Sequence, residues 1–212
     1  MDLSYIVRIV PALLRGAGVT LALFALVFPL SLPLGFLVTL CANCRFKPVK
    51  WLMRGTPLML QLFFFYYGLP FLPGIGQYLR LSSFAAAALS FTLNYAAYFA
   101  EIFRGGLLSI DRGQYEVSHV LGLTSFQTMT RIIIPQMIRV TLPSIGNEAI
   151  TLVKDTALVA SIALPELLHY AKGIVTRDFT TTPFIVAAFI YLLITFVVTV
   201  LFKFAERKTN YE

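Results

Sequence analysis

The chain has 212 residues, of which 58% are hydrophobic and only 13% are charged, and its mean hydropathy is +0.80. Because ordinary soluble domains carry about 25% charged residues, this composition excludes most soluble classes and indicates a protein of the lipid bilayer. The net charge of +7 is scattered among apolar segments, so we interpret it as membrane-topology charge and not as a nucleic-acid-binding stripe.

The chain begins with a segment that differs from the apolar stretch behind it. Residues 1–17 mix acidic and basic side chains and lack a signal-peptide cleavage pattern, which predicts a short amphipathic helix lying at the membrane surface. Residues 18–40 are apolar enough for a first span, and Pro29 and Pro33 are predicted to interrupt it.

Both cysteines of the chain follow this span, in the sequence CANC (Cys41 and Cys44). A C-x-x-C pair can be half of a zinc or redox site, but a structural zinc site needs four ligands and no second pair exists. We therefore predict no metal site, and interpret the two cysteines as small residues at a helix end.

Further apolar stretches complete a multi-span pattern, because a helix needs about 20 residues to cross the hydrocarbon core. We predict spans at about 51–67, 84–103, from Ile138 onward, and 184–204. Residues 157–168 contain Pro165 and are predicted to form a separate half-helix, which a membrane protein tolerates where the segment is buried or lines a cavity. The predicted fold class is an all-α integral membrane protein, with one transmembrane domain (1–212) of five helices.

The distribution of positive charge predicts the orientation of these spans. Eleven of the 17 Lys and Arg residues lie in segments that the predicted spans place on one side, namely 41–54, 104–139 and 203–212, whereas five lie on the other side. The positive-inside tendency therefore places the C-terminus and the loop 104–139 in the cytoplasm, and the N-terminus outside.

The cytoplasmic loop contains a polar insert, Tyr115 to Pro135, that is too polar to cross a membrane. We predict two short helices in it, with Glu116 near the start of the first, Gly122 between them, and Thr124 or Ser125 as the N-cap of the second. Such a loop is expected to dock against another protein. The alternative, an amphipathic segment lying on the bilayer, is disfavoured because the insert has few Lys and Arg residues.

The spacing of this insert resembles a known loop. The pattern Glu116-Val-Ser118-x3-Gly122-x9-Ile-x-Ile-Pro135 is similar to the E-A-A-x3-G-x9-I-x-L-P loop of ABC importer permeases, with Val and Ser at the two alanine positions and Ile at the leucine. Three further blocks resemble the polar amino acid branch (histidine, glutamine, arginine or cystine type): RGTPLMLQLFFFYYGLP from Arg54, AEIFRGGLLSIDRGQYE from Ala100, and LVKDTALVASIALPEL from Leu152. Compared with that branch, the second span is predicted to be short before Arg54.

The resemblance implies a type I importer permease fold in a bacterial inner membrane. It implies that Glu116, Ser118, Gly122 and Pro135 couple the chain to a separate ATP-binding cassette subunit, which would bind ATP and Mg. It also implies two further partners: an extracytoplasmic amino-acid-binding protein, and a second permease copy or paralogue that completes the path as a dimer. No G-x-x-x-x-G-K-[ST] phosphate loop occurs in the sequence, so we predict that this chain is not an ATPase, has no cofactor and is not an enzyme.

Candidate substrate-binding residues lie on one face of the fourth span. At 100° per residue, Ser144, Glu148, Thr151 and Asp155 occupy a stripe about 60° wide. Ionisable groups at membrane depth are costly and usually functional, and carboxylates suit an ammonium or guanidinium group. On the third span, Asn94, Tyr98 and Glu101 share a face by the same arithmetic.

The resemblance assigns ligand contact to Asn94, Glu148 and Asp155, and favours cationic or zwitterionic amino acids. Structural interpretations stand beside it: Asp155 can form an ion pair with Lys154, and Glu101 can form one with Arg104. Tyr66, Tyr67 and Tyr98 are interpreted as interface aromatics.

Two other function classes remain open on the residues alone. An ion-coupled secondary transporter predicts inverted repeats, which we do not find in the sequence. An intramembrane enzyme of aspartyl type would use Glu148 and Asp155, and would turn over without an ATPase. His119 and His169 are not accompanied in the sequence by other residues at metal-ligand spacing, so we predict no metal site at either.

Overall fold

The computed structural model describes residues 3–40 and 52–209, and every regular element in them is helical. In chain order these are α1 (Leu3–Leu40), α3 (Leu58–Phe63), η1 (Phe64–Gly68), η2 (Leu69–Phe71), η3 (Gly76–Tyr78), α4 (Ser83–Ser109), α5 (Arg112–Val120), α6 (Ser125–Thr128), η4 (Met129–Ile133), α7 (Ile134–Asp155), η5 (Thr156–Ile162), α8 (Leu167–Asp178) and α9 (Thr182–Thr209). Cys41, Cys44 and the predicted start of the second span at Trp51 lie outside the described residues.

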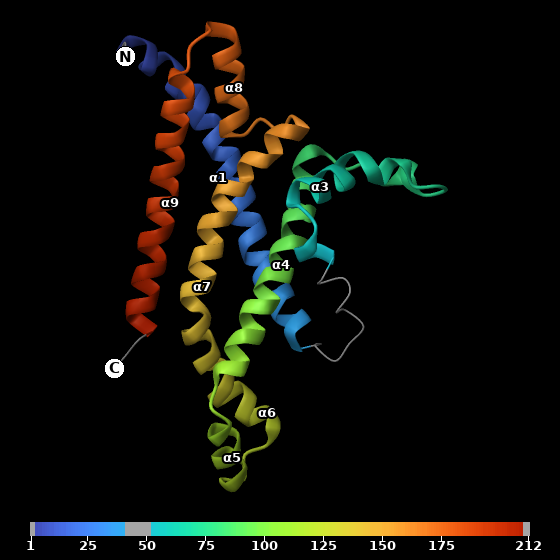
Figure 1. Cartoon of the computed structure of the whole chain (residues 1–212), viewed down its shortest axis with the longest axis vertical. Helices are drawn as coiled ribbons and strands as arrows, with labels where there is room; N and C mark the ends of the chain where they lie inside the picture. The colour runs from blue at the N-terminus through green and yellow to red at the C-terminus, as the bar shows by residue number, and fades with distance from the viewer. Residues whose placement is uncertain (1–2, 41–51, 210–212) are drawn as a thin grey trace.

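Helix α1 is one continuous helix of 38 residues, which differs from two predictions. Residues 3–17, the described part of the segment 1–17, are not a separate helix, and Pro29 and Pro33 do not interrupt the span, although both lie inside it. A proline removes one backbone hydrogen bond, but membrane helices tolerate it where neighbouring helices support the backbone. Here α1 packs along α4 (Figure 1), with Leu23 and Val27 fully buried in the shared core.

The core lies between α1, α4 and α7. Helix α4 contributes its largest side chains, Phe91, Tyr95 and Phe99, which are almost completely buried. Helix α7 packs against both α4 and α9, and α8 packs against α1. The predicted third, fourth and fifth spans therefore exist as α4, α7 and α9, with α7 beginning at Ile134, four residues earlier than predicted.

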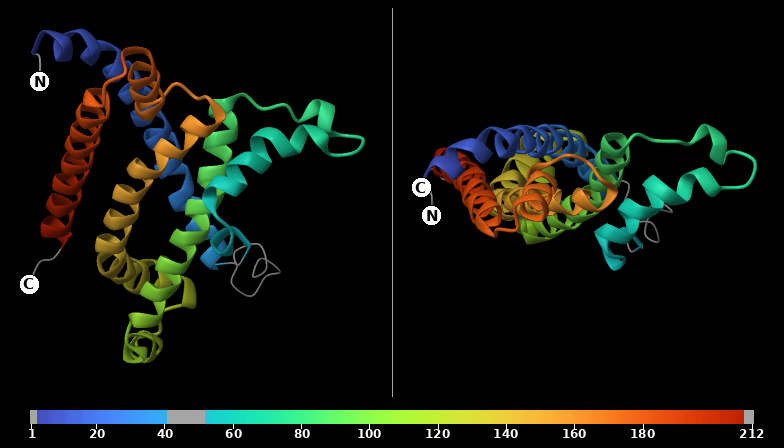
Figure 2. Two further views of the ribbon diagram at one scale, coloured as in Figure 1. Left: turned by 45° about the horizontal axis from the view of Figure 1, so that its top comes forward. Right: turned by 90° about the horizontal axis from the view of Figure 1, so that it is seen from above.

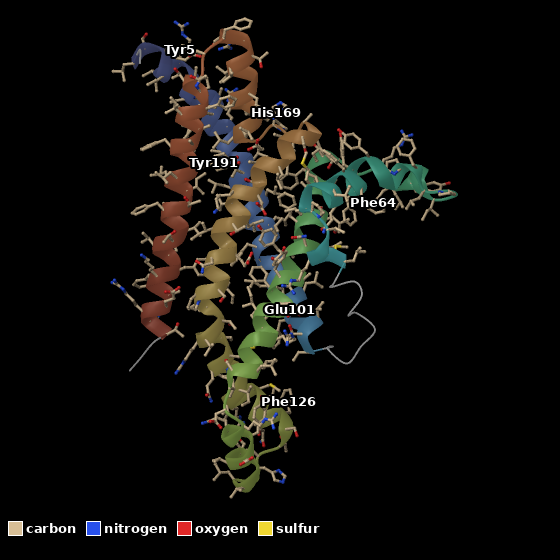
Figure 3. All side chains as sticks on the ribbon, viewed as in Figure 1. Tyr5, Phe64, Glu101, Phe126, His169 and Tyr191 are labelled. Atoms are coloured by element: carbon tan, nitrogen blue, oxygen red, sulfur yellow. The ribbon has the colours of Figure 1, made fainter. Side chains whose placement is uncertain are left out.

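The second predicted span is not one regular helix. Pro57 precedes α3, and the residue before a proline is disfavoured in helical conformation, so the helical residues 52–55 are separated from α3. After six residues α3 changes to the π-helical η1, and then to the 3-10 turn η2. Together these elements form an arm that extends sideways from the bundle, and Phe64 lies on it (Figures 2 and 3). The part of this span that was predicted to be short, before Arg54, lies mostly outside the described residues, so the shortening stays a prediction.

The two ends of the molecule carry different elements. The short helices α5 and α6 lie at one end, and the C-terminal end of α9 points toward it (Figure 1). The N-terminus and α8 lie at the opposite end. Among the described helices, α1 and α9 are long and apolar enough to cross a membrane by length and composition. Helices α4 and α7 have 27 and 22 residues.

The predicted half-helix at 157–168 is two elements. Residues Thr156–Ile162 form the 3-10 helix η5, which ends at Ala163 in a left-handed conformation (φ 57°). Pro165 then separates η5 from α8, whose N-cap is Glu166. The break is therefore a turn that redirects the chain between α7 and α8.

Candidate functional site

A cavity of about 380 Å³ opens between the segment before α3, helix α4 and helix α7. It is lined by Arg54, Gly55, Thr56, Pro57, Leu58, Asn94, Tyr95, Tyr98, Glu148, Thr151 and Asp155. The structure thus brings together four of the five predicted substrate-binding residues. Ser144 is the exception: it lies on the same face of α7, but it is exposed and does not line this cavity.

The two carboxylates of α7 have different surroundings. An Asp155 oxygen accepts a hydrogen bond of 2.8 Å from the Tyr95 hydroxyl, which ties α7 to α4. In the described part of the chain, no ion pair joins Asp155 to Lys154. The structural partner of Asp155 is instead the Tyr95 hydroxyl. Glu148 is half-buried in the cavity wall, and among the described residues its carboxylate has no hydrogen-bond partner.

Asn94 is 4% exposed and its amide group holds the neighbouring segment in place. Its Nδ2 donates to the Met53 carbonyl oxygen at 2.8 Å and to Gln61 Oε1 at 3.1 Å. Gln61 in turn donates to the same Met53 carbonyl and to the Thr56 hydroxyl. The Asn94 amide hydrogens are therefore used to fix residues 53–61 against α4, which leaves its Oδ1 as the atom able to meet a ligand.

A cation also lines this cavity. The Arg54 guanidinium lies over the Tyr98 ring, with 5.4 Å from Cζ to the ring centroid, and its Nη1 is 3.8 Å from Glu101 Oε2. Glu101 binds Arg104 more closely, at 2.7 Å to Nη2 and 3.0 Å to Nε, so the predicted structural pair Glu101–Arg104 is confirmed. Tyr98, interpreted from the sequence as an interface aromatic, lines the cavity.

The loop at the other end is built from well-capped short helices. Asp111 caps α5, accepting from the Gly113 amide at 2.6 Å, so α5 begins earlier than predicted and Glu116 lies in its middle. Gly122 has φ +74° and ends α5: its N–H donates to the His119 carbonyl, and the Leu123 N–H donates to the Ser118 carbonyl. This pair of bonds is the Schellman termination, which favours glycine. Thr124 caps α6 in a capping box with Gln127, as predicted.

The predicted coupling residues do not all face outward. Glu116, Gly122 and Pro135 are exposed, whereas Ser118 is 1% exposed and its hydroxyl donates to the Gln114 carbonyl. Because Ser118 packs inside the loop, it supports α5 and does not offer a contact surface. The predicted role of Ser118 in coupling stays a prediction, and it would act by supporting α5 from inside the loop.

The outer surface of the loop is hollow and apolar. A cavity of about 580 Å³ lies between α5 and α6, lined by Tyr115, Glu116, His119, Val120, Leu123, Ser125, Thr128 and Met129. Large apolar side chains around it are exposed, namely Val120 (86%), Leu121 (70%) and Phe126 (77%), of which Phe126 is labelled in Figure 3. Exposed apolar patches at a polar end of a protein mark an interaction site.

At the opposite end, a fully buried glutamate lies where three helices meet, and its carboxylate joins two of them. Glu166 accepts from the Leu168 and His169 amides of α8 at 2.8 and 2.7 Å, and from the Tyr191 hydroxyl of α9 at 2.7 Å. Its backbone lies against Gly16 of α1, where a Cβ would come within 2.8 Å of it. Sequence reasoning missed Glu166, although an acidic residue just after Pro165 is favoured by the helix dipole at the start of a helix.

The outermost residues of this end are tied by charge. Asp178 accepts from Arg177 at 2.6 and 2.8 Å and from the Tyr5 hydroxyl at 2.8 Å. The Arg177 hydrogen bonds and the Tyr5 hydrogen bond lower the pKa of Asp178 to about 2, so this carboxylate is ionised at neutral pH. These hydrogen bonds join the first turns of α1 to the end of α8. Figure 3 labels Tyr5 of this contact and Tyr191 of the Glu166 contact.

Comparison with known proteins gives one consistent result. Residues 3–211 match the family described as binding-protein-dependent transport system inner membrane component. The chain is 35% identical to the arginine transport system permease protein ArtQ of Bacillus subtilis, covering 98% of this chain and 97% of that protein. It is 34% identical to the L-cystine transport system permease protein TcyB of the same organism, covering 94% and 87%.

A solved structure supports the same fold. The chain superimposes on a chain from the crystal structure of an amino acid ABC transporter with histidines with a TM-score of 0.86 and 31% identity, covering 98% of this chain and 99% of that one. The architecture is therefore the type I ABC importer permease fold. Permease subunits of this kind are not enzymes, because the ATPase is a separate subunit, and the intramembrane-enzyme alternative is set aside. The chain belongs to the family of binding-protein-dependent transport system inner membrane components, as the permease subunit of an amino acid ABC importer.

Proposed function

We propose that this permease subunit imports cationic or zwitterionic polar amino acids, such as arginine, lysine or histidine, or glutamine or cystine, and that Glu148 and Asp155 bind the cationic group of the substrate. The observation that carries the proposal is the placement of both carboxylates in one cavity wall, one helical turn on either side of Thr151. A carboxylate at membrane depth that has no hydrogen-bond partner among the described residues, as we propose for Glu148, is the kind of group that meets a cation during transport.

The choice of substrate class draws on chemistry and on the relatives. The names of ArtQ and TcyB specify arginine and L-cystine, which share an α-ammonium group. A carboxylate accepts strong charge-assisted hydrogen bonds from ammonium and guanidinium groups alike. Because Glu148 adds a second negative charge to the cavity, basic side chains are favoured over neutral ones.

The coupling proposal follows from the continuity of the backbone. The outer surface of α5 and α6 is proposed to dock on the ATPase subunit through Glu116 and the exposed apolar side chains around it. From Met129 to Asp155 the chain is helical without a break, so a displacement of the loop is passed along α7. Glu148 lies about 21 Å from the start of α7 at 1.5 Å per residue, within reach of a rigid-body motion.

The assembly is proposed to contain further subunits. An extracytoplasmic binding protein delivers the amino acid, and a second copy or paralogue of this chain faces it across a two-fold axis to complete the path. In the proposed orientation the C-terminus and the α5–α6 loop lie in the cytoplasm and the N-terminus lies outside; the charge distribution supports this proposal. ATP binding in the partner subunits then shifts the permeases between two states of access.

The experiment that tests the substrate site compares two positions on the same helical face. The importer is reconstituted in vesicles with its ATPase and binding protein, and uptake of labelled arginine is measured with unlabelled competitors. Glu148→Gln is expected to lower arginine uptake about tenfold or more, because a hydrogen bond to a charged group is lost. The control is Ser144→Ala, which alters the same face outside the cavity and is expected to leave uptake unchanged. Wild-type uptake and selectivity in Glu148→Gln would return this residue to a structural role.

A further inference from the structure

We propose that Arg54 is the residue that binds the α-carboxylate of the transported amino acid, opposite Glu148 and Asp155. This inference rests on the proposed function, since it assigns the second half of the same site. Its consequence is that the permease itself recognises the amino acid head group, and not only a basic side chain.

The cavity is bipolar, and this matches the chemistry of an amino acid. The segment before α3 supplies the Arg54 guanidinium, and α7 supplies the two carboxylates, all lining one volume of about 380 Å³. An α-amino acid carries a carboxylate and an ammonium group on one carbon, so it can neutralise both walls at once. Arginine binds carboxylates in a bidentate, planar geometry.

The present contacts of Arg54 leave it available for a ligand. Its distance of 3.8 Å to Glu101 is too long for a hydrogen bond, and Glu101 is bound more closely by Arg104 at 2.7 Å. The Tyr98 ring beneath the guanidinium holds it by a cation–π contact, which leaves the N–H edge able to donate. Exchanging the long Glu101 contact for a substrate carboxylate therefore gives up little.

The backbone that carries Arg54 is fixed in place. The carbonyl oxygen of Met53, the residue just before it, accepts from both Gln61 at 2.7 Å and Asn94 at 2.8 Å. Thr56, two residues after it, donates to the Leu52 carbonyl at 2.8 Å and accepts from Gln61. Asn94 is thus a positioning residue for Arg54, which gives a reason for a buried amide at the centre of α4.

The test measures binding to the permease without the binding protein, which would add its own selectivity. The purified permease–ATPase complex in lipid nanodiscs is titrated with arginine and with argininamide, in which a neutral amide replaces the α-carboxylate. Wild type is expected to prefer arginine about 10- to 100-fold. Arg54→Gln should lose this preference by weakening arginine alone, whereas Arg139→Gln, an equal charge change at an exposed site on α7 outside the cavity, should keep it.

Two further variants separate this inference from the proposed function. Glu148→Gln should weaken arginine and argininamide to a similar extent, because both retain the ammonium and guanidinium groups. Glu101→Gln, which releases Arg54 from its ion pair, should preserve the preference or increase it. If Arg54→Gln does not assemble, Arg54→Lys keeps the charge but loses the fork of donors, and a partial loss of preference is expected.

The possible outcomes distinguish a failure of the Arg54 assignment from a failure of the proposed substrate site. No preference in wild type, or a full preference in Arg54→Gln or Arg54→Lys, overturns the role of Arg54 while leaving Glu148 untouched. Unchanged affinity for both ligands in Glu148→Gln and in Asp155→Asn instead overturns the proposed substrate site. A loss of preference for arginine over argininamide in Arg54→Gln supports the complete assignment if Arg139→Gln and Glu101→Gln both keep that preference.

Discussion

Glu148 and Glu166 are two carboxylates with opposite surroundings. Glu166 is fully buried and accepts from two backbone amides and a tyrosine hydroxyl, so its hydrogen-bonding capacity is used within the fold. Glu148 is half-buried, and in the described part of the chain it has no hydrogen-bond partner. Since burying a carboxylate without hydrogen bonds is costly, this difference supports the proposal that Glu148, and not Glu166, binds the substrate.

Gly122 gives a prediction at the residue scale. Its φ of +74° lies in the left-handed region, while a Cβ added there would meet no atom within 4 Å. The requirement is therefore conformational and not steric. Gly122→Val should strain the end of α5 by about 1–2 kcal/mol or more, and should lower ATPase stimulation by the loaded binding protein. Gly122→Asn, a residue that tolerates this conformation, should remain close to wild type; equal loss in both variants would show that the space around Gly122 matters instead.

At the scale of elements, close helix contacts depend on single glycines of α1. A Cβ on Gly16 would lie 2.7 Å from Leu167 Cα and 2.8 Å from the Glu166 carbonyl, so α1 and α8 touch backbone to backbone. Small residues permit such approach between membrane helices. Gly18, two residues later on the same helix, has no neighbour within 4 Å of its Cβ position. Gly16 is therefore a position of close helix contact, and Gly18 is a position in the same helix where a side chain has room.

This pair makes the second prediction. Gly16→Ala should destabilise the purified protein by about 1–3 kcal/mol, as overpacking does, because backbone atoms must move. Gly18→Ala should be neutral or stabilising by up to about 1 kcal/mol, since alanine is the better helix former. Thermal unfolding in one detergent, followed for wild type and both variants, measures the difference. A Gly16→Ala variant as stable as Gly18→Ala would contradict the close packing of α1 on α8.

The part of the site that lies on one regular helix could be predicted from the sequence, and the part contributed by other segments could not. Glu148, Thr151 and Asp155 were predicted together because α7 is a regular helix of 22 residues, and helical periodicity holds within one regular element. Ser144 fits the same periodicity but lies beyond the cavity, whose extent depends on other segments. Arg54 could not be predicted from periodicity, since it lies in the short segment before Pro57 and meets Tyr98 of α4 only through the tertiary fold.

In the loop, the features that depend on local residue types were predicted better than the bounds of the helices. Gly122 and the Thr124 cap were predicted correctly, because caps and left-handed turns depend on local residue types. The start of α5 was placed too late because the Asp111 signal was overlooked. The continuity of α1 through Pro29 and Pro33 comes from packing along α4, which local proline rules do not contain.

At the scale of the whole molecule, the two ends must face different compartments if the coupling proposal is correct. The C-terminal end of α9 points toward the end that carries α5 and α6, and α8 lies at the far end (Figure 1). In a chain with Cys41→Ser and Cys44→Ser, exposed positions near each end, Lys172→Cys on α8 or Lys208→Cys on α9, report their side to a membrane-impermeant maleimide. We expect Lys172→Cys to react in spheroplasts and Lys208→Cys to react only after the membrane is opened. Reaction of Lys208→Cys from outside would reverse the orientation, and would place the apolar surface around Glu116 where no ATPase could reach it. Because an ATP-driven importer needs its coupling loop in the compartment that supplies ATP, that single result would refute the assignment of α5 and α6.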